Sequence, residues 1–218
     1  MKILQKICFV LLLTTFSSVY GGSCWDGDVD DCRVEAEQGK SWAQYNLGLI
    51  YSKGQSVPQN YKEAVKWFRR SAEQGNSDAQ NILGSMYYEG LGVLQDYKES
   101  VKWFRLSSEQ GLAEAQFSLG LMYYEGKGVL QDYKESVKWW RKAAEQGSDS
   151  AQISLGSTYS LGKGVPQDYV MAHMYFNIGS VSGRKDAIQG RGIVETVMTS
   201  SQLEKAQDLA REWMRNHQ

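Results

Sequence analysis

The stretch "DYKESVKWFR" at Asp96–Arg105 returns almost unchanged 36 positions later, as "DYKESVKWWR" at Asp132–Arg141. A leucine–glycine pair keeps the same step through the chain, at Leu47-Gly48, Leu83-Gly84, Leu119-Gly120 and Leu155-Gly156. A fixed period of about 20–50 residues is typical of solenoids and repeat arrays. The sequence therefore predicts four repeats of 36 residues with a cap at each end of the array.

Each repeat shows helical spacing of apolar residues twice. In the third repeat, Ala115, Leu119 and Tyr123 lie four apart and form the buried stripe of a first helix, helix A. A second stripe for helix B follows at Tyr133, Val137, Trp140 and Ala144. Asp132 is placed to cap the start of helix B, and Gly147 to end it. One repeat is thus a helical hairpin.

Such hairpins bury their apolar stripes by stacking on one another. The predicted fold class is all-α, a right-handed α/α solenoid of four 36-residue helical hairpins with an N-terminal half-repeat and a C-terminal capping helix. The predicted division is a signal peptide at 1–22, a half-repeat cap at 23–39, repeats 1 to 4 at 40–75, 76–111, 112–147 and 148–183, and capping helices at 184–218.

The segment "AEAQFSLGLMYYEGKGVLQDYKESVKWWRKAAEQG" resembles the Sel-one-like repeat, a relative of the tetratricopeptide repeat with a longer loop between its helices. The shared positions are a Leu-Gly-x-x-Tyr core and a Gly-x-Gly-Val loop, here Leu119, Gly120, Tyr123, Gly126, Gly128 and Val129. Repeat 1 departs at Ser56, where the second loop glycine is expected. The tail is similar to the closing helix of such arrays, with Ser201 and Glu204 placed as a capping box.

The N-terminus has the order of a secretory signal: Lys2 and Lys6, an apolar run too short to span a bilayer, then small and polar residues. We expect export to the periplasm or beyond the cell, with no membrane span after signal removal. Cys24 and Cys32 then form an even pair, which favours a disulfide. A lipid anchor on Cys24 is the alternative.

The charge balance argues against nucleic acid as a partner. Losing Lys2 and Lys6 leaves 22 basic against 25 acidic residues, and no basic stripe is present to neutralise phosphates. His173 and His217 are the only histidines, and no Cys/His/carboxylate cluster has metal-ligand spacing. We therefore expect no cofactor, no metal and no catalytic residues. His173 takes the place of a valine in the other repeats and is expected to be a half-buried packing residue.

Three features that resemble active sites are better explained by the fold. The Gly-Lys-Gly loops lack the spacing of a phosphate-binding loop, and the "KWFR" aromatics fall on the helix B stripe. Some cysteine-rich exported relatives carry a β-lactamase or penicillin-binding label, which is the enzyme alternative. The Ser-x-x-Lys motifs at Ser160–Lys163 and Ser182–Lys185 lie in loops, and the other serine β-lactamase motifs are missing.

A binding surface remains. Three helix A slots that vary between repeats share one face, and in tetratricopeptide-like stacks this face lines the concave groove. The predicted partner-binding residues are Trp42, Tyr45, Leu49, Asn81, Ser85, Phe117, Leu121 and Ile153. Exposed aromatic and aliphatic side chains of this kind supply binding energy, although they could instead only pack against the next repeat. The resemblance implies an adaptor. We expect a monomer that binds a protein or peptide.

Overall fold

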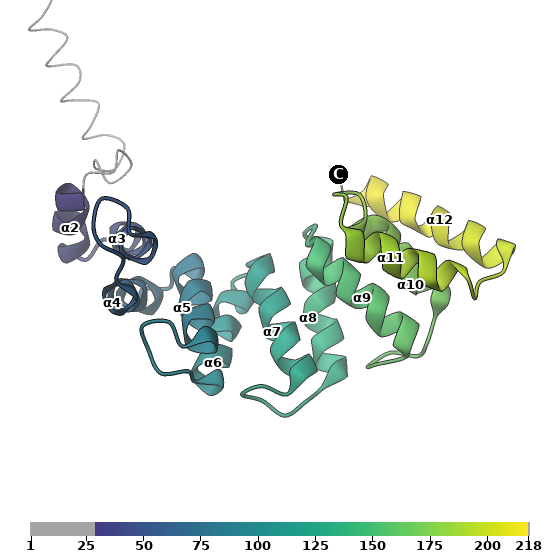
Figure 1. Cartoon of the computed structure of the whole chain (residues 1–218), viewed down its shortest axis with the longest axis horizontal. Helices are drawn as coiled ribbons and strands as arrows, with labels where there is room; N and C mark the ends of the chain where they lie inside the picture. Colours follow the sequence, from purple (N-terminus) through teal and green to yellow (C-terminus); the bar gives the residue numbers. More distant parts are fainter. Residues whose placement is uncertain (1–28, 218) are drawn as a thin grey trace, which may run out of the picture. The chain divides into compact units, whose positions relative to one another are not determined.

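The computed structural model describes residues 29–217 of the chain. These residues contain eleven α-helices and no strand, which confirms the predicted all-α class. Consecutive helices pair along the chain as in an α/α solenoid (Figure 1). The chain divides into two units, one ending at Gln95 and the other beginning at Asp96, and each is described by itself.

The first unit contains four helices. They are α2 (Val29–Glu37), α3 (Ser41–Lys53), α4 (Tyr61–Glu73) and α5 (Ser77–Glu89). Each packs on the next along the chain. Helix α2 falls within the predicted half-repeat of residues 23–39. Its Cys32 is buried beside Ala36, Ala43 and Leu47, and its partner in the predicted disulfide, Cys24, lies outside the described residues.

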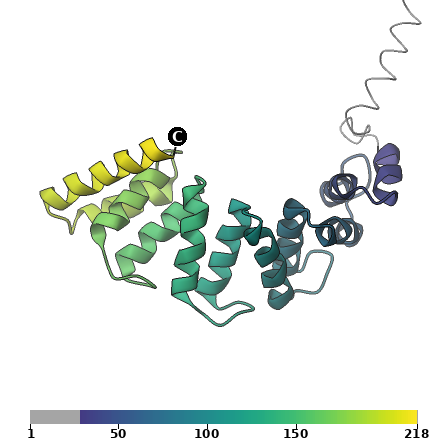
Figure 2. The same ribbon diagram turned by 180° about the vertical axis from the view of Figure 1, so that it is seen from behind.

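The second unit contains seven helices. They are α6 (Tyr97–Glu109), α7 (Ala113–Glu125), α8 (Tyr133–Glu145), α9 (Asp149–Leu161), α10 (Tyr169–Gly179), α11 (Lys185–Glu195) and α12 (Ser200–Asn216). The order of packing follows the chain from α6 to α10. The pattern then changes, because both α11 and α12 pack on α10, and they close the C-terminal end of the unit (Figures 1 and 2).

The helix ends follow the local sequence. The Asp132 carboxylate accepts hydrogen bonds from the backbone N–H groups of Lys134 and Glu135, so the predicted N-cap of helix B is confirmed. The predicted capping box is wrong by two residues. Thr199 is the N-cap of α12 and pairs reciprocally with Gln202, which places both Ser201 and Glu204 inside the helix.

The repeated leucine–glycine pair has a packing reason. A Cβ atom on Gly120 would lie 2.5 Å from the Trp140 ring, and one on Gly48 would lie 2.7 Å from the Phe68 ring. Real Cβ atoms do not approach this closely, so only glycine lets the aromatic ring of helix B pack this close to helix A. The "KWFR" and "KWWR" aromatics are all buried, and this confirms them as core residues: Trp67, Phe68, Trp103, Phe104, Trp139 and Trp140.

Polar bonds join helix B of one repeat to helix A of the next. Four arginine–tyrosine pairs, each 18 residues apart, are hydrogen-bonded from guanidinium to hydroxyl: Arg33–Tyr51, Arg69–Tyr87, Arg105–Tyr123 and Arg141–Tyr159. A buried glutamine on each helix A also donates to a carbonyl at the end of the preceding helix B, in the pairs Gln44–Ala36, Gln80–Ala72, Gln116–Ser108 and Gln152–Ala144. These bonds explain why the arginine, the tyrosine and the glutamine recur with the period.

The predicted signal peptide, residues 1–22, lies outside the described residues. Between residues 29 and 217, no helix combines the length and apolar character needed to cross a bilayer.

Candidate binding surface

In the first unit, the predicted surface residues Trp42, Tyr45 and Leu49 are half-buried on α3. The Tyr45 ring lies 6.0 Å from the ring of Phe68 on α4, centroid to centroid. The Lys40 ammonium lies 5.9 Å from the centre of the Trp42 ring. Burial raises the pKa of the Tyr45 hydroxyl, and the charge of Asp78 on α5 raises it further. Tyr45 is therefore close enough to the next helix A to interact with it electrostatically.

The corresponding residues of α5 are polar. Ser85 is exposed, and its hydroxyl donates to the Asn81 carbonyl at 3.1 Å. Asn81 is half-buried, and within the described part of the chain its side-chain Oδ1 atom is buried without a hydrogen-bond partner. The first unit thus presents two different surfaces on its helix A copies, one aromatic on α3 and one polar on α5.

In the second unit, Phe117 and Leu121 are half-buried on α7 and pack against the main core. The Phe117 ring stacks on Trp140 at 6.3 Å with an interplanar angle of 24°. The Trp140 indole N–H also donates to the Phe117 carbonyl at 3.1 Å. One side of Phe117 therefore packs within its own hairpin, and its remaining area is open to solvent.

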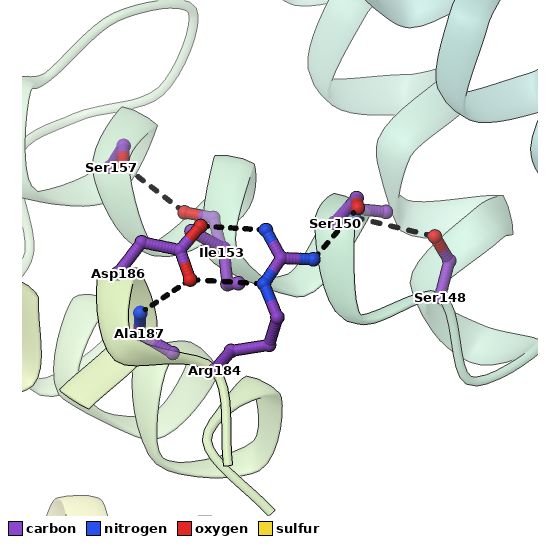
Figure 3. A network of polar contacts seen from close by, with 8 residues as sticks. Ser148, Ser150, Ile153, Ser157, Arg184, Asp186 and Ala187 are labelled. Atoms are coloured by element: carbon purple, nitrogen blue, oxygen red, sulfur yellow. Dashed lines mark hydrogen bonds and ion pairs between the residues drawn. The ribbon is translucent and has the colours of Figure 1, made fainter. Parts of the chain in front are cut away.

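The last copy of the slot differs because the C-terminal cap approaches it. Ile153 on α9 packs so closely on α10 that a Cβ on Gly179 would lie 3.0 Å from its Cγ1. Arg184, just before α11, holds Asp186 and also donates to the Ser150 hydroxyl at 3.3 Å (Figure 3). In the second unit, the part of the helix A face that stays open to solvent is therefore centred on α7.

The expectation that the large apolar side chains of this set are exposed is wrong. Trp42, Tyr45, Leu49, Phe117 and Leu121 are half-buried, and only Ser85 among the eight residues is exposed. The physical reason is the position of the slots at the edge of the seam between helix A and helix B. Period and spacing indicate that a slot lies off the central stripe, but they do not indicate how far a neighbouring ring covers it.

The lysines of the Gly-Lys-Gly loops, which resemble phosphate binders, already contact other side chains of the protein. The Lys163 ammonium donates to the Tyr124 hydroxyl at 3.1 Å and lies about 5 Å from the Tyr124 and Tyr133 ring centres. Lys127 lies 2.9 Å from Glu125 and over the Tyr97 ring. These contacts join neighbouring repeats. Within residues 29–217, no three His, Cys, Asp or Glu side chains gather as metal ligands would.

One polar cluster was not predicted from the sequence. His173 is fully buried rather than half-buried, and its Nε2 atom lies 2.9 Å from a carboxylate oxygen of Glu195 on α11. The repeat pattern of the sequence does contain a signal for this cluster. Asn177 and Glu195 occupy the arginine and tyrosine positions of the inter-repeat pairs, so the loss of both residue types marks the place.

Comparison with known proteins agrees with this architecture. The Sel1 repeat profile matches residues 43–76, 77–112, 113–148 and 149–180. A solved protein from uropathogenic Escherichia coli, c5321, is 39% identical with a TM-score of 0.81 over 87% of this chain. This chain covers 41% of that protein's length. Its description is of a protective antigen with an SLR fold.

Two further structures are similar. A Sel1 repeat protein from Oxalobacter formigenes is 32% identical with a TM-score of 0.69, covering 83% of this chain and 75% of its own. A putative Sel1 repeat protein from Klebsiella pneumoniae shares the fold at 19% identity and a TM-score of 0.53, covering 84% of this chain and 99% of its own. Comparison with curated proteins gives no significant match. The four matched repeats and the two more similar structures show that the chain belongs to the Sel1 repeat family.

Proposed function

We propose that this protein is a non-catalytic scaffold that binds a protein or peptide with the helix A face of its repeats. Members of the family are typically protein-interaction scaffolds. One slot carries the proposal: it holds Tyr45 and Phe117 in two repeats but Asn81 and Ile153 in the others. Since the same hairpin forms around all four, the fold does not require an aromatic ring there. Partly open aromatic rings are the side chains that most often anchor a partner.

The proposed place of action is the periplasm or the outside of the cell. The support is the charged, apolar and small-residue order of residues 1–22. The similar E. coli protein is described as a protective antigen, and we take this as further support for the proposal. Fractionation of a native culture, with intact mass of the exported chain, tests this part of the proposal.

The partner is best identified by photo-crosslinking from the face itself. A crosslinking amino acid at Leu49 or Leu121 should capture one defined partner from the exported fraction. The same group at Lys66 or Lys138, exposed positions on α4 and α8, should not. Equal capture from both pairs of positions would place the interface elsewhere.

The binding role of the slot is then tested by exchanging residues between repeats. Tyr45→Asn with Phe117→Ile installs the residues that Asn81 and Ile153 already provide in the same slot. We expect a loss of about 2 kcal/mol of binding, roughly thirtyfold in affinity, with a similar melting temperature. The matched control is Lys66→Ala with Lys138→Ala. Unchanged affinity, or early melting of the exchange variant, would show that the rings serve packing alone.

A separate assay tests the alternative that the protein is a β-lactamase. In the β-lactamase alternative a lysine would activate the serine of a Ser-x-x-Lys motif, whereas the Lys163 ammonium of one such motif is hydrogen-bonded to the Tyr124 hydroxyl. Hydrolysis of a chromogenic β-lactam by the purified chain, lost in Ser160→Ala with Ser182→Ala, would replace the scaffold proposal.

A further inference from the structure

The series of arginine–tyrosine pairs is broken at its fifth position. Four pairs join helix B to the following helix A, from Arg33–Tyr51 to Arg141–Tyr159. The next two positions in phase are Asn177 on α10 and Glu195 on α11. The asparagine is shorter than the arginine it replaces, and the glutamate is more polar than the tyrosine it replaces. The C-terminal cap therefore lacks the guanidinium–phenol contact that fills this position between the other repeats.

A polar cavity lies at this place. Its volume is about 320 Å³, and it is lined by His173, Asn177, Arg191, Glu195, Gln207 and Arg211. The lining comes from α10, α11 and α12, which pack together within the second unit. Small-molecule sites occupy about 300–1,000 Å³, so the cavity can take a small ligand or one residue of a chain. Every lining side chain is polar or charged, in contrast to the apolar core beside it.

The buried wall of the cavity is made by His173. It takes the position of Val65, Val101 and Val137, and its side chain is only 1% exposed. One ring nitrogen, Nε2, contacts Glu195 at 2.9 Å. The other, Nδ1, is buried without a partner in the described part of the chain. Buried polar atoms are nearly always satisfied by protein, water or a ligand, so an unsatisfied Nδ1 atom is unusual in a residue that lines this cavity.

Donors outnumber acceptors in the lining. The Glu195 carboxylate already contacts His173 and lies 3.5 Å from the Arg191 Nε atom. Arg191 is held in place by the Asn177 oxygen at 3.0 Å. Arg211 pairs with Asp208, but both side chains are about 60% exposed, and such surface pairs contribute little. The Arg211 guanidinium can therefore exchange Asp208 for a ligand without much loss.

We propose that this cavity is a carboxylate-binding site, separate from the helix A face. Arg211 would hold the carboxylate with its two-pronged guanidinium, the geometry that favours planar carboxylates. Gln207 and Arg191 also line the cavity and supply further donors. The negative charge of Glu195 disfavours a doubly charged phosphate more than a singly charged carboxylate. The carboxylate belongs either to the end of a peptide chain or to a small free acid.

Histidine NMR on the full chain tests the proposal, because the chain has only His173 and His217. N-acetylalanine should shift the His173 ring resonances saturably, whereas the uncharged N-acetylalaninamide should not. His217 is the internal control, since its ring stacks on Trp213 at 4.1 Å and does not line the cavity. A weaker effect of acetate than of N-acetylalanine indicates a chain terminus as the natural source, and an equal effect indicates a free acid.

Variants distinguish binding at this cavity from a nonspecific effect of the added carboxylic acid. Arg211→Gln should weaken the N-acetylalanine effect at least about tenfold, and Arg215→Gln, on the same helix outside the cavity, should leave it unchanged. Asn177→Arg with Glu195→Tyr, which restores the arginine–tyrosine pair, should fill the cavity and abolish the effect.

Three results would overturn the proposal. One is no His173 shift up to roughly 50 mM N-acetylalanine, far above millimolar affinity. Another is an equal shift with the amide. The third is inorganic phosphate binding more tightly than the carboxylates. If the double variant that restores the arginine–tyrosine pair does not fold, the comparison of Arg211→Gln with Arg215→Gln still tests the proposal.

Discussion

At Gly128, two independent physical constraints act on one residue. Its φ of 72° lies in the left-handed region, which favours glycine. A Cβ atom there would also lie 2.2 Å from the backbone carbonyl oxygen of Tyr97, in helix B of the preceding repeat. Backbone cannot move aside as a flexible side chain can. Gly147 shares the first constraint only, with φ at 86° and nothing within 4 Å of its Cβ position.

The two glycines give a matched pair of substitutions. Gly147→Ala should destabilise the chain by about 1–2 kcal/mol, the cost of left-handed backbone for an L-residue. Gly128→Ala should cost about 1–3 kcal/mol more, because the contact between repeats must open as well. Urea unfolding of both variants measures the difference. Equal costs would mean that the close approach of the loop to helix B is absent in solution.

Recurrence in the sequence predicted which residues the fold requires, but not what the exceptions do. Ser56 keeps a φ of 60° where repeats 2 to 4 use glycine, so the loop of repeat 1 has the same local conformation despite its different sequence. The half-buried state of Phe117 depends on Trp140, and the cavity depends on helices beyond the last repeat. The spacing of residues within one repeat predicts neither the burial of Phe117 nor the cavity.

At the scale of elements, helix starts could be predicted where one candidate cap stands alone. Asp132 is followed at once by the helix B stripe, and the structure confirms it as the N-cap. The start of α12 offers two overlapping candidates two residues apart, Thr199 with Gln202 and Ser201 with Glu204. The earlier pair forms because Thr199 is extended, with φ −77° and ψ 160°, whereas Ser201 is already helical. Sequence alone does not rank them.

Helix α2 depends on its cysteine more than a complete hairpin would. It is nine residues long and begins the described array, and its Cys32 is buried. Short helices are marginal alone, and a disulfide between Cys24 and Cys32 would stabilise this end of the chain by restricting its unfolded state. We predict that Cys24 and Cys32 of the exported chain resist alkylation in denaturant and react only after reduction.

The use of denaturant in this measurement removes burial as an explanation for an unreactive Cys32. Intact mass distinguishes the alternatives. A mass increase of two alkyl groups without reduction would exclude the disulfide, and the mass of a lipid on Cys24 would show an anchor instead.

At the scale of the whole molecule, stability depends on contacts between neighbours along the chain. Within the second unit, each helix from α6 to α9 packs on the helix that follows it, and only the C-terminal cap departs from this order, because α11 and α12 both pack on α10. The bonds that join repeats also have the same phase in every copy. Stability in such an array is close to a sum of repeat and interface contributions, with no single core that all residues share.

The most direct test of this architecture is the melting curve of a chain lacking Leu112–Gly147, followed by circular dichroism. Deletion of this whole period brings Arg105 into phase with Tyr159, and Gly164 into phase with Tyr97, so each broken contact between repeats can re-form with a residue of the same type. The account predicts a helical chain that still melts cooperatively, at a somewhat lower temperature. Loss of helical signal, or a gradual melt without a transition, would contradict it.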